Sequence, residues 1–308
     1  MSVNDKILVI IEPDVHPDEV ASRAAWLAEL AKCDLEFLLC DPDVGALREG
    51  LLFSNEAHDL AQKIRQAQDE ILADLAEPAR SRGIVVNTQV LEERPIAEGV
   101  LHHAREMQPR FVIKGTHYHS SAERSIFVDT DWQLVRSCDY PLWLVKPHAM
   151  REKPVIVAAV DPTHSHDKPA ALDQVIVEAA QSLQRAADGE LHLIHTYHRL
   201  IGVGREATRT FKPIKLPVDE LAKKIQEDHR ALLDELATKY DVDAEHTHQL
   251  PGDAKEILPT FARAHGADLI VMGALARWGL KRAVLGSTAE KVLDHLPCDI
   301  LIVRSADD

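Results

Sequence analysis

The sequence predicts an α/β protein built from two similar doubly wound halves, and two observations support this prediction. One pattern of residues is written twice along the 308-residue chain. In each copy, short runs of Val, Ile and Leu alternate with longer segments of helical periodicity. Because uninterrupted apolar runs are typical of strands buried on both faces, this alternation favours a parallel sheet covered by helices.

The repeat is clearest in three pairs of apolar runs. The run ILVIIEP resembles VIVAAVDP, which aligns Glu12 with Asp161. Two later pairs, RFVIKG with DLIVMG and YPLWLVKP with CDILIVRS, share one spacing of 158 residues. A constant spacing indicates a duplicated unit. The chain is also about twice the length of a usual domain, as two copies require.

Strands and helices are expected to alternate through each copy. The strands of the first copy are expected at residues 7–11, 35–40, 85–90, 111–114 and 142–145. Its helices are expected at residues 19–32, 57–79, 96–107 and 129–137, where apolar residues recur at three- and four-residue spacing. The second copy repeats this order and includes a long helix at residues 218–239.

The chain therefore divides into two predicted domains. The first covers residues 1–147 and the second covers residues 155–308. Residues 148–154 form the predicted linker, because this stretch is charged and prolines bracket it.

Composition excludes several classes of function. A formal charge of -15 disfavours binding to nucleic acid or to an anionic membrane surface, since both require clustered Lys and Arg. The sequence contains no apolar run long enough to predict a membrane span or a signal peptide, so we expect a cytoplasmic protein. The four cysteines lack C-x-x-C or disulfide-framework spacing and are expected to be reduced, buried thiols.

The stretch VMGALARWGLKRAVLGSTAEKV in the second copy has the pattern of a phosphate loop. Ligands of open parallel sheets bind beyond the carboxyl ends of the strands, which here directs attention to Asp161 and Gly273. Gly273 would let the chain turn off its strand, and Gly286 would let the backbone approach a phosphate at a helix N-terminus. Ser287 and Thr288 would add hydroxyl donors.

The loop spacing and the duplicated fold resemble the universal stress protein superfamily, whose nucleotide-binding members carry G-x2-G-x9-G-[ST]. The resemblance covers essentially the whole chain and is to the tandem members. It implies the strand order 3-2-1-4-5 in each of two five-stranded sheets. It also implies that the apolar fifth strands, at residues 142–145 and 300–303, pair with each other to form an internal pseudo-dimer, which would cover both exposed edges.

Carried over by position, the resemblance implies a site for ATP or a related adenine nucleotide. Asp161 would contact adenine or ribose, and Thr196 would add a second contact. The phosphate loop would consist of Gly273, Ala276, Gly286, Ser287 and Thr288. Ala276 stands where the family pattern has its second glycine, and its methyl group would hinder the close approach of a phosphate to the backbone. The residues STAE also match a capping box, so a purely structural loop stays open as an alternative.

The first copy is poorer at the equivalent positions. Tyr118, Val128 and Asp129 replace two glycines and the serine of the pattern, and Glu12 replaces the aspartate. Because the Asp129 carboxylate would repel phosphate oxygens, we expect no nucleotide in this half. Three aromatic residues lie near its mouth: Tyr118, Phe127 and Trp132. They leave a lipid-like ligand open as an alternative to ordinary core packing.

Histidine is abundant and forms three H-x-H pairs: His117/His119, His164/His166 and His246/His248. On an extended segment this spacing puts both imidazoles on one face, which can begin a zinc or copper site. No C-x-x-C or H-E-x-x-H accompanies them, so no metal ligand is assigned. His246 and His248 are expected on a strand in an exposed or hydrogen-bonded role, and His102 and His103 receive the same interpretation on a helix.

The leading hypothesis is a cytoplasmic stress-response protein that binds ATP through its C-terminal half as a sensor or regulator. The resemblance implies roles in survival of starvation, oxidative stress or DNA damage. No catalytic residue is assigned, because nucleophile-elbow, kinase and G-K-[ST] signatures are all missing from the sequence; at most slow nucleotide hydrolysis is expected. A ligand-independent interaction protein, with protein partners or as a homo-oligomer, remains the alternative, as does a metal or lipid-like ligand in the N-terminal half.

Overall fold

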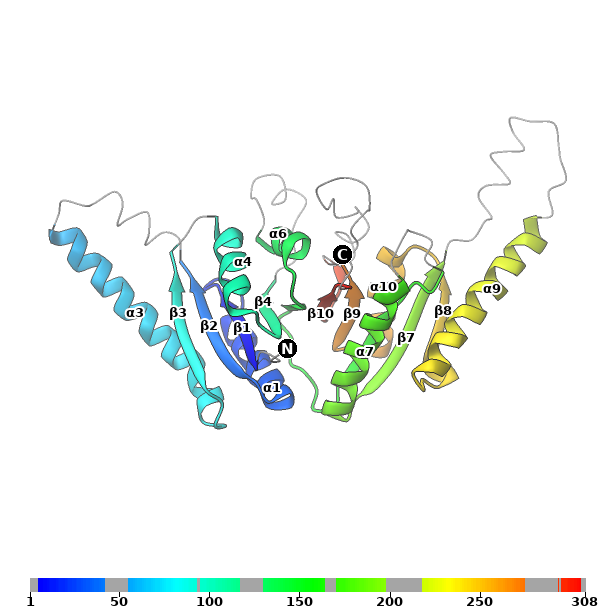
Figure 1. The fold of residues 1–308 in the computed structure, drawn as a ribbon, viewed down its shortest axis with the longest axis horizontal. Coiled ribbons are helices and arrows are strands. Elements are labelled where there is room, and N and C mark those ends of the chain that lie inside the picture. Colours follow the sequence, from blue (N-terminus) through cyan, green and yellow to red (C-terminus); the bar gives the residue numbers. More distant parts are fainter. Residues whose placement is uncertain are drawn as a thin grey trace, which may run out of the picture.

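A computed structural model describes residues 5–41, 55–92, 95–116, 130–163, 170–197, 218–274, 293 and 295–305. Within these ranges the chain forms a ten-stranded sheet with helices packed against it (Figure 1). The expected α/β class is confirmed. None of the helices in this described part is long and apolar enough to cross a membrane.

The strands follow the duplicated order of the sequence. They are β1 (Lys6–Ile11), β2 (Asp34–Cys40), β3 (Val86–Leu91), β4 (Phe111–Gly115), β5 (Leu142–Val145), β6 (Val155–Ala159), β7 (Glu190–Tyr197), β8 (Thr247–Pro251), β9 (Leu269–Gly273) and β10 (Asp299–Val303). Across the sheet their order is β3-β2-β1-β4-β5-β10-β9-β6-β7-β8. Each half therefore has the expected 3-2-1-4-5 order.

The two halves join through β5 and β10, which pair antiparallel. Ile300 is opposite Leu144, and Leu301 is opposite Trp143. This confirms the predicted pairing of the fifth strands. The hydrogen bonds of this pair join the two five-stranded halves into one continuous mixed sheet.

Helices cover both faces of the sheet. They are α1 (Pro17–Ala31), α3 (Asn55–Arg80), α4 (Ile96–Met107), α6 (Thr130–Ser137), α7 (Ala170–Ala187), α9 (Val218–Lys239) and α10 (Ala254–His265), with a 3-10 turn η2 (Ala244–His246). Residues of α1, α3, α7 and α9 join one hydrophobic core, and residues of α4, α6 and α10 join the other. Alternate residues of each inner strand point into each core, which explains the uninterrupted apolar runs.

The expected boundaries lie within two residues of the observed ones, and one difference has a clear cause. Val85 was expected to begin the third strand, but β3 begins at Val86. The Val85 side chain is 55% exposed, so it adds nothing to either core, although its carbonyl accepts a hydrogen bond from the Leu35 amide (2.9 Å). Apolar composition alone therefore places this strand end one residue early.

A buried charge network around Asp299 of β10 holds the two halves together. The Asp299 carboxylate accepts hydrogen bonds from Trp143 Nε1 (2.8 Å) and the Lys146 amide (3.0 Å), and it lies 3.2 Å from Arg23 Nε. His148 Nε2 lies 3.0 Å from the same carboxylate. The Arg23 and Asp299 side chains are 3% and 0% exposed. The second half is thus bound through one residue to helix α1, to β5 and to the segment that follows β5.

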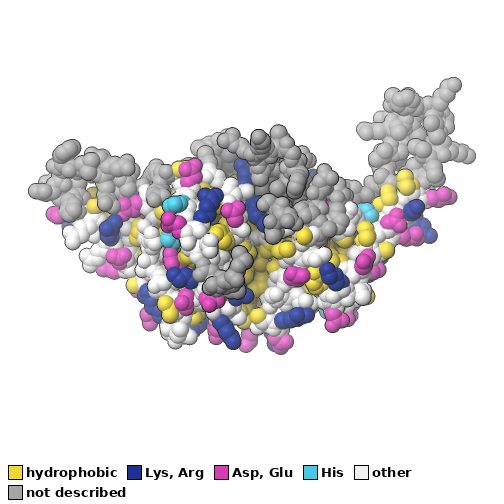
Figure 2. Space-filling view, in the orientation of Figure 1, with side chains coloured by type: hydrophobic (Ala, Val, Ile, Leu, Met, Phe, Trp, Pro, Cys, Tyr) yellow, Lys and Arg dark blue, Asp and Glu magenta, His cyan; other side chains and the backbone are white. Residues whose placement is uncertain are grey.

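Charged side chains of both signs are mixed over the surface. On the face shown in Figure 2, Lys and Arg lie among Asp and Glu, and the chain as a whole has a formal charge of -15. The described part of this face therefore presents no extended area of basic side chains alone.

Candidate functional site

The carboxyl ends of β6, β7 and β9 lie next to each other where the strand order of the second half reverses. Ala159, the last residue of β6, is opposite Ile194 on β7 and Met272 on β9. Thr196 lies two residues after Ile194, and Gly273 directly follows Met272. Asp161 follows directly after β6. The structure thus brings Asp161, Thr196 and Gly273 to one edge of the sheet, as their positions in the sequence predicted.

The Asp161 carboxylate is oriented by its neighbours. Its backbone amide donates to Asp173 Oδ1 (3.0 Å), and Thr163 Oγ1 donates to Asp161 Oδ1 (2.7 Å). The side chain remains 16% exposed. A fixed carboxylate that still reaches solvent can accept hydrogen bonds from the hydroxyl or amino groups of a ligand.

Two histidines behind Asp161 belong to the same edge. His195 of β7 is 2% exposed, and its Nδ1 lies 3.2 Å from the Val160 carbonyl oxygen and 3.9 Å from Asp161 Oδ1. Its Nε2 lies 3.0 Å from Nδ1 of His229 on α9. Burial lowers the pKa of His195, which favours a neutral ring at pH 7. Sequence reasoning missed this pair, because the periodicity of α9 does not reveal which strand residue it meets.

Gly273 lies directly against the Leu172 side chain of α7. A Cβ atom at this position would lie 2.6 Å from Cδ2 of Leu172 on α7. The φ angle of Gly273 lies outside the left-handed region. The glycine therefore lets α7 approach β9 closely, whereas the sequence interpretation had assigned it a sharp turn. Thr196 is partly buried and, by strand alternation, points to the face opposite His195.

The remaining members of the expected phosphate loop fall outside the described residues. They are Ala276, Gly286, Ser287 and Thr288. The pair His164/His166, expected beside the same site, also falls outside them. The strand ends and the residues that orient Asp161 are therefore the part of the candidate site that the structure describes.

At the equivalent edge of the first half, the ammonium group of Lys114 lies among carboxylates at the strand ends. Lys114 Nζ of β4 lies 2.6 Å from Glu12 Oε2 and 2.5 Å from Oδ1 of Asp131 on α6. Thr116 Oγ1 donates to the other Asp131 oxygen (2.5 Å). Burial lowers the pKa of Lys114, but Asp131 and Glu12 outweigh it and raise the pKa overall. The ammonium group therefore stays charged, and the Glu12 carboxylate is already engaged.

Other residues singled out in the first half are described only in part. The positions Tyr118, Phe127, Val128, Asp129, His117 and His119 lie outside the described residues. Trp132, the remaining aromatic residue of that group, is 8% exposed and belongs to the hydrophobic core. Ordinary core packing therefore accounts for Trp132.

The His246/His248 pair is divided between two elements. His248 lies on β8, as expected, but His246 belongs to η2. His248 Nε2 is 2.9 Å from His192 Nδ1 of β7, so its expected hydrogen-bonded role is confirmed. Burial, followed by the neighbouring His192, lowers the pKa of His248 to about 4.

The helix histidines and the cysteines also match their expected roles. His103 Nε2 lies 2.5 Å from Glu36 Oε1, and His102 is exposed with Glu106 at 3.5 Å. The four cysteines are free and buried: Cys33, Cys40, Cys138 and Cys298. Cys40 is the last residue of β2, and its pKa is raised to about 12, by burial first and then by Glu12.

Comparison with known sequences covers nearly the whole chain. The sequence model of the Universal stress protein family matches residues 4–146 and 154–304. The chain is 26% identical over 308 residues to Universal stress protein E of Salmonella typhi, covering 99% of this chain and 95% of that protein. It is 24% identical over 310 residues to the Universal stress protein E homolog of Haemophilus influenzae, covering 97% and 96%.

Solved structures show the same fold. A structure from Pseudomonas aeruginosa UCBPP-PA14, described as a universal stress protein, superposes with a TM-score of 0.71 at 24% identity and covers 98% of this chain and 94% of its own. A universal stress protein from Archaeoglobus fulgidus DSM 4304 gives a TM-score of 0.65 at 14% identity and covers 98% of both chains. The tandem arrangement in one chain is thus shared with these proteins.

Proposed function

The chain belongs to the universal stress protein family, and we propose that this stress-response protein binds ATP or a related adenine nucleotide in its C-terminal half. In this proposal it acts in the cytoplasm as a sensor or regulator. The observation that supports it best is the meeting of Asp161, Thr196 and Gly273 where the strand order reverses. The glycine-rich stretch that follows Gly273 along the chain would supply the phosphate contacts.

The chemistry of Asp161 suits the sugar end of a nucleotide. Its carboxylate is held by Thr163 and by the bond from its own amide to Asp173, so little reorganisation is needed when a ribose hydroxyl donates to it. Hydrogen bonds to a charged acceptor contribute about 1.5–3 kcal/mol. Replacing Asp161 with asparagine is therefore expected to weaken ATP binding by about 10- to 100-fold.

The contrast between the halves favours the C-terminal one. In the first half Lys114 Nζ lies 2.6 Å from Glu12 Oε2, and the equivalent of Lys114 in the second half is Met272. Met272 carries no charge, so it cannot form the ion pair that Lys114 forms in the first half. In the second half the Asp161 carboxylate accepts from Thr163 and is 16% exposed, so a ligand hydroxyl could also reach it.

Calorimetry with ATP tests the proposal on the full chain and on two matched variants. Gly286→Asp places a carboxylate in the proposed phosphate loop. Val128→Asp places the same charge 158 residues earlier, at the equivalent position of the first half. We expect wild type and Val128→Asp to bind one ATP with similar affinity. Gly286→Asp should lose binding, because its charge repels phosphate.

Two outcomes contradict the proposal. Wild type that binds no ATP at millimolar concentration would favour a ligand-independent interaction protein. Equal ATP affinity in wild type and Gly286→Asp would place the nucleotide elsewhere. Measuring phosphate release in the same samples distinguishes simple binding from slow hydrolysis.

A further inference from the structure

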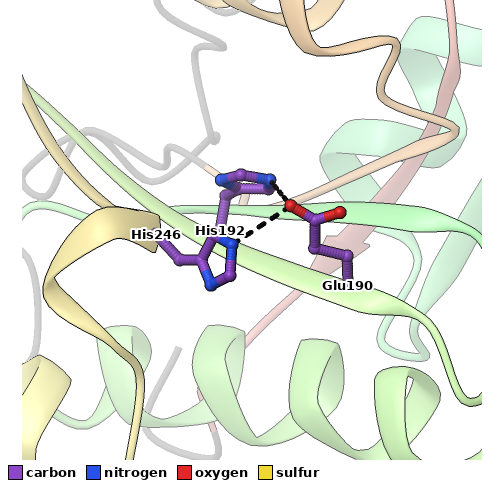
Figure 3. Close-up of side chains that lie close together, drawn as sticks. All are labelled: Glu190, His192 and His246. Carbon is purple, nitrogen blue, oxygen red and sulfur yellow. Dashed lines mark ion pairs between the residues drawn. The ribbon is translucent and has the colours of Figure 1, made fainter.

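A cluster of imidazoles surrounds the start of β7, away from the strand ends that form the proposed nucleotide site. Three of its members are shown in Figure 3: Glu190, His192 and His246. His248 and His265 complete it, with ring centroids 5.1 and 5.4 Å from that of His192. Four histidines from β7, η2, β8 and α10 thus meet beside one carboxylate.

Three side-chain atoms of this cluster, one carboxylate oxygen and two imidazole nitrogens, lie close together. Glu190 Oε1 lies 2.8 Å from His192 Nε2 and 3.2 Å from His246 Nε2 (Figure 3). All three potential ligand atoms lie within 4.8 Å of one another. Ligand atoms around a tetrahedral zinc ion are about 3.3 Å apart, as bonds of about 2.0–2.1 Å require. A small rotation of the exposed Glu190 side chain would widen its distances to both histidines to that spacing.

The second ring nitrogen of His192 already has the kind of partner that metal-binding histidines use. His192 Nδ1 lies 2.9 Å from His248 Nε2. When His192 donates its Nδ1 proton to His248, its Nε2 lone pair faces the Glu190 carboxylate. Two electron-rich atoms in that arrangement attract a cation, and the hydrogen bond to His248 fixes the ring that would hold it.

We propose that Glu190, His192 and His246 bind a divalent transition-metal ion of the zinc type, with His248 as the positioning residue behind His192. Two imidazoles and one carboxylate match the ligand preference of Zn²⁺ and leave one coordination position for solvent. The Glu190 and His246 side chains are 48% and 31% exposed, which gives the ion a route in. His192, at 6% exposed, forms the inner wall.

This site is separate from the proposed nucleotide site. Thr196 lies four positions after His192 on β7, a distance of about 13 Å along an extended strand. The bound ion would connect β7 to η2, directly before β8, which is an edge strand of the ten-stranded sheet. Its expected effect is therefore to stabilise that edge, since an ion that binds only the folded chain raises the folded population.

The test uses the full chain without a histidine tag and Zn²⁺ as the probe. We expect one equivalent to bind in calorimetry and to raise the thermal unfolding midpoint. Co²⁺ in place of Zn²⁺ should give the intense visible absorption of a tetrahedral site. His248→Ala should weaken Zn²⁺ binding by about 10- to 100-fold, as loss of an outer partner typically does.

Two matched pairs of variants test the assignment of ligands. Glu190→Gln should lose most Zn²⁺ affinity, whereas Glu245→Gln should keep it, although Glu245 also lies near His246 with Asp243. His246→Ala should lose binding, whereas His103→Ala, which removes the histidine of the His103–Glu36 pair in the first half, should not. Both ligand variants change partly exposed side chains, and far-UV circular dichroism checks that they fold.

Three results would overturn the proposal. Wild type that binds no Zn²⁺ at micromolar concentration excludes the site. Full affinity in both Glu190→Gln and His246→Ala shows that the ion binds elsewhere. Loss of affinity in Glu245→Gln but not in Glu190→Gln moves the site to the exposed carboxylates beside η2.

Discussion

Replacing Asp299 with asparagine should show how much the buried charge network between the two halves contributes to the stability of the folded chain. In the folded chain Asp299 accepts hydrogen bonds from Trp143 and Lys146 and pairs with Arg23. Asparagine keeps the size of the side chain but has one carbonyl oxygen where aspartate has two acceptors. Its amide nitrogen must therefore face one set of these donors.

The expected cost follows from the burial of the charges. Arg23 is 3% exposed and would lose its anionic partner inside the protein. Removing one partner of a buried ion pair costs about 3–5 kcal/mol, because the remaining charge stays desolvated. We expect Asp299→Asn to lower the free energy of unfolding by that amount, a large part of the stability of a typical protein.

Urea unfolding followed by far-UV circular dichroism measures this loss. A second variant, Arg23→Met, and the double variant complete a mutant cycle. The double variant should lose less stability than the sum of the two single losses, since it leaves no unpaired charge. Wild type serves at each step as the reference for the slope of the transition, which must stay constant if the same folded state unfolds.

The reasoning is refuted if Asp299→Asn costs less than about 1 kcal/mol, the range of an exposed ion pair. Strictly additive losses in the cycle would contradict it as well, because they would show that Arg23 and Asp299 do not depend on each other.

The remaining predictions concern the buried Lys114 and the partly buried His148. Lys114→Met, which copies Met272 of the second half, should cost about 3–5 kcal/mol because it leaves the buried Asp131 and the partly buried Glu12 without their cation. Met272→Leu, its control, should cost less than about 1.5 kcal/mol in the same urea assay. The hydrogen bond to Asp299 raises the pKa of His148 above 6.5, although burial and Arg23 oppose it. Its stabilisation should be fully present below pH 6.5 and be lost as pH rises through the higher folded value. The stability difference between wild type and His148→Gln should therefore shrink from about pH 5.5 to pH 8.5, and a constant difference would contradict the prediction.

Features that repeat in the sequence could be predicted well. The fifth strand of the first half was placed at its observed limits, Leu142–Val145, because four buried apolar residues have few other interpretations. The helix Val218–Lys239 was placed equally well from its periodicity. The pairing of β5 with β10 was implied by the family resemblance, and it covers two apolar edges.

Contacts between side chains from distant segments could not be predicted in the same way. Parallel strands are joined by crossovers, so neighbours in the sheet are far apart in the chain. His192 and His248 are separated by 56 positions, and the sequence pattern had paired His248 with His246 instead. Lys114 inside a strand gave no sign that Glu12 and Asp131 would surround it.

The continuous sheet also determines what a single substitution can do. In a dimer of identical subunits, every change appears at both copies of a site and must be tolerated twice. Here β5 and β10 belong to one polypeptide, so their association does not weaken on dilution and each half can change alone. Lys114 can therefore form ion pairs at one set of strand ends, while the equivalent position of the other half is Met272. Because the two halves are covalently linked, their equivalent strand-end sites can carry different residues.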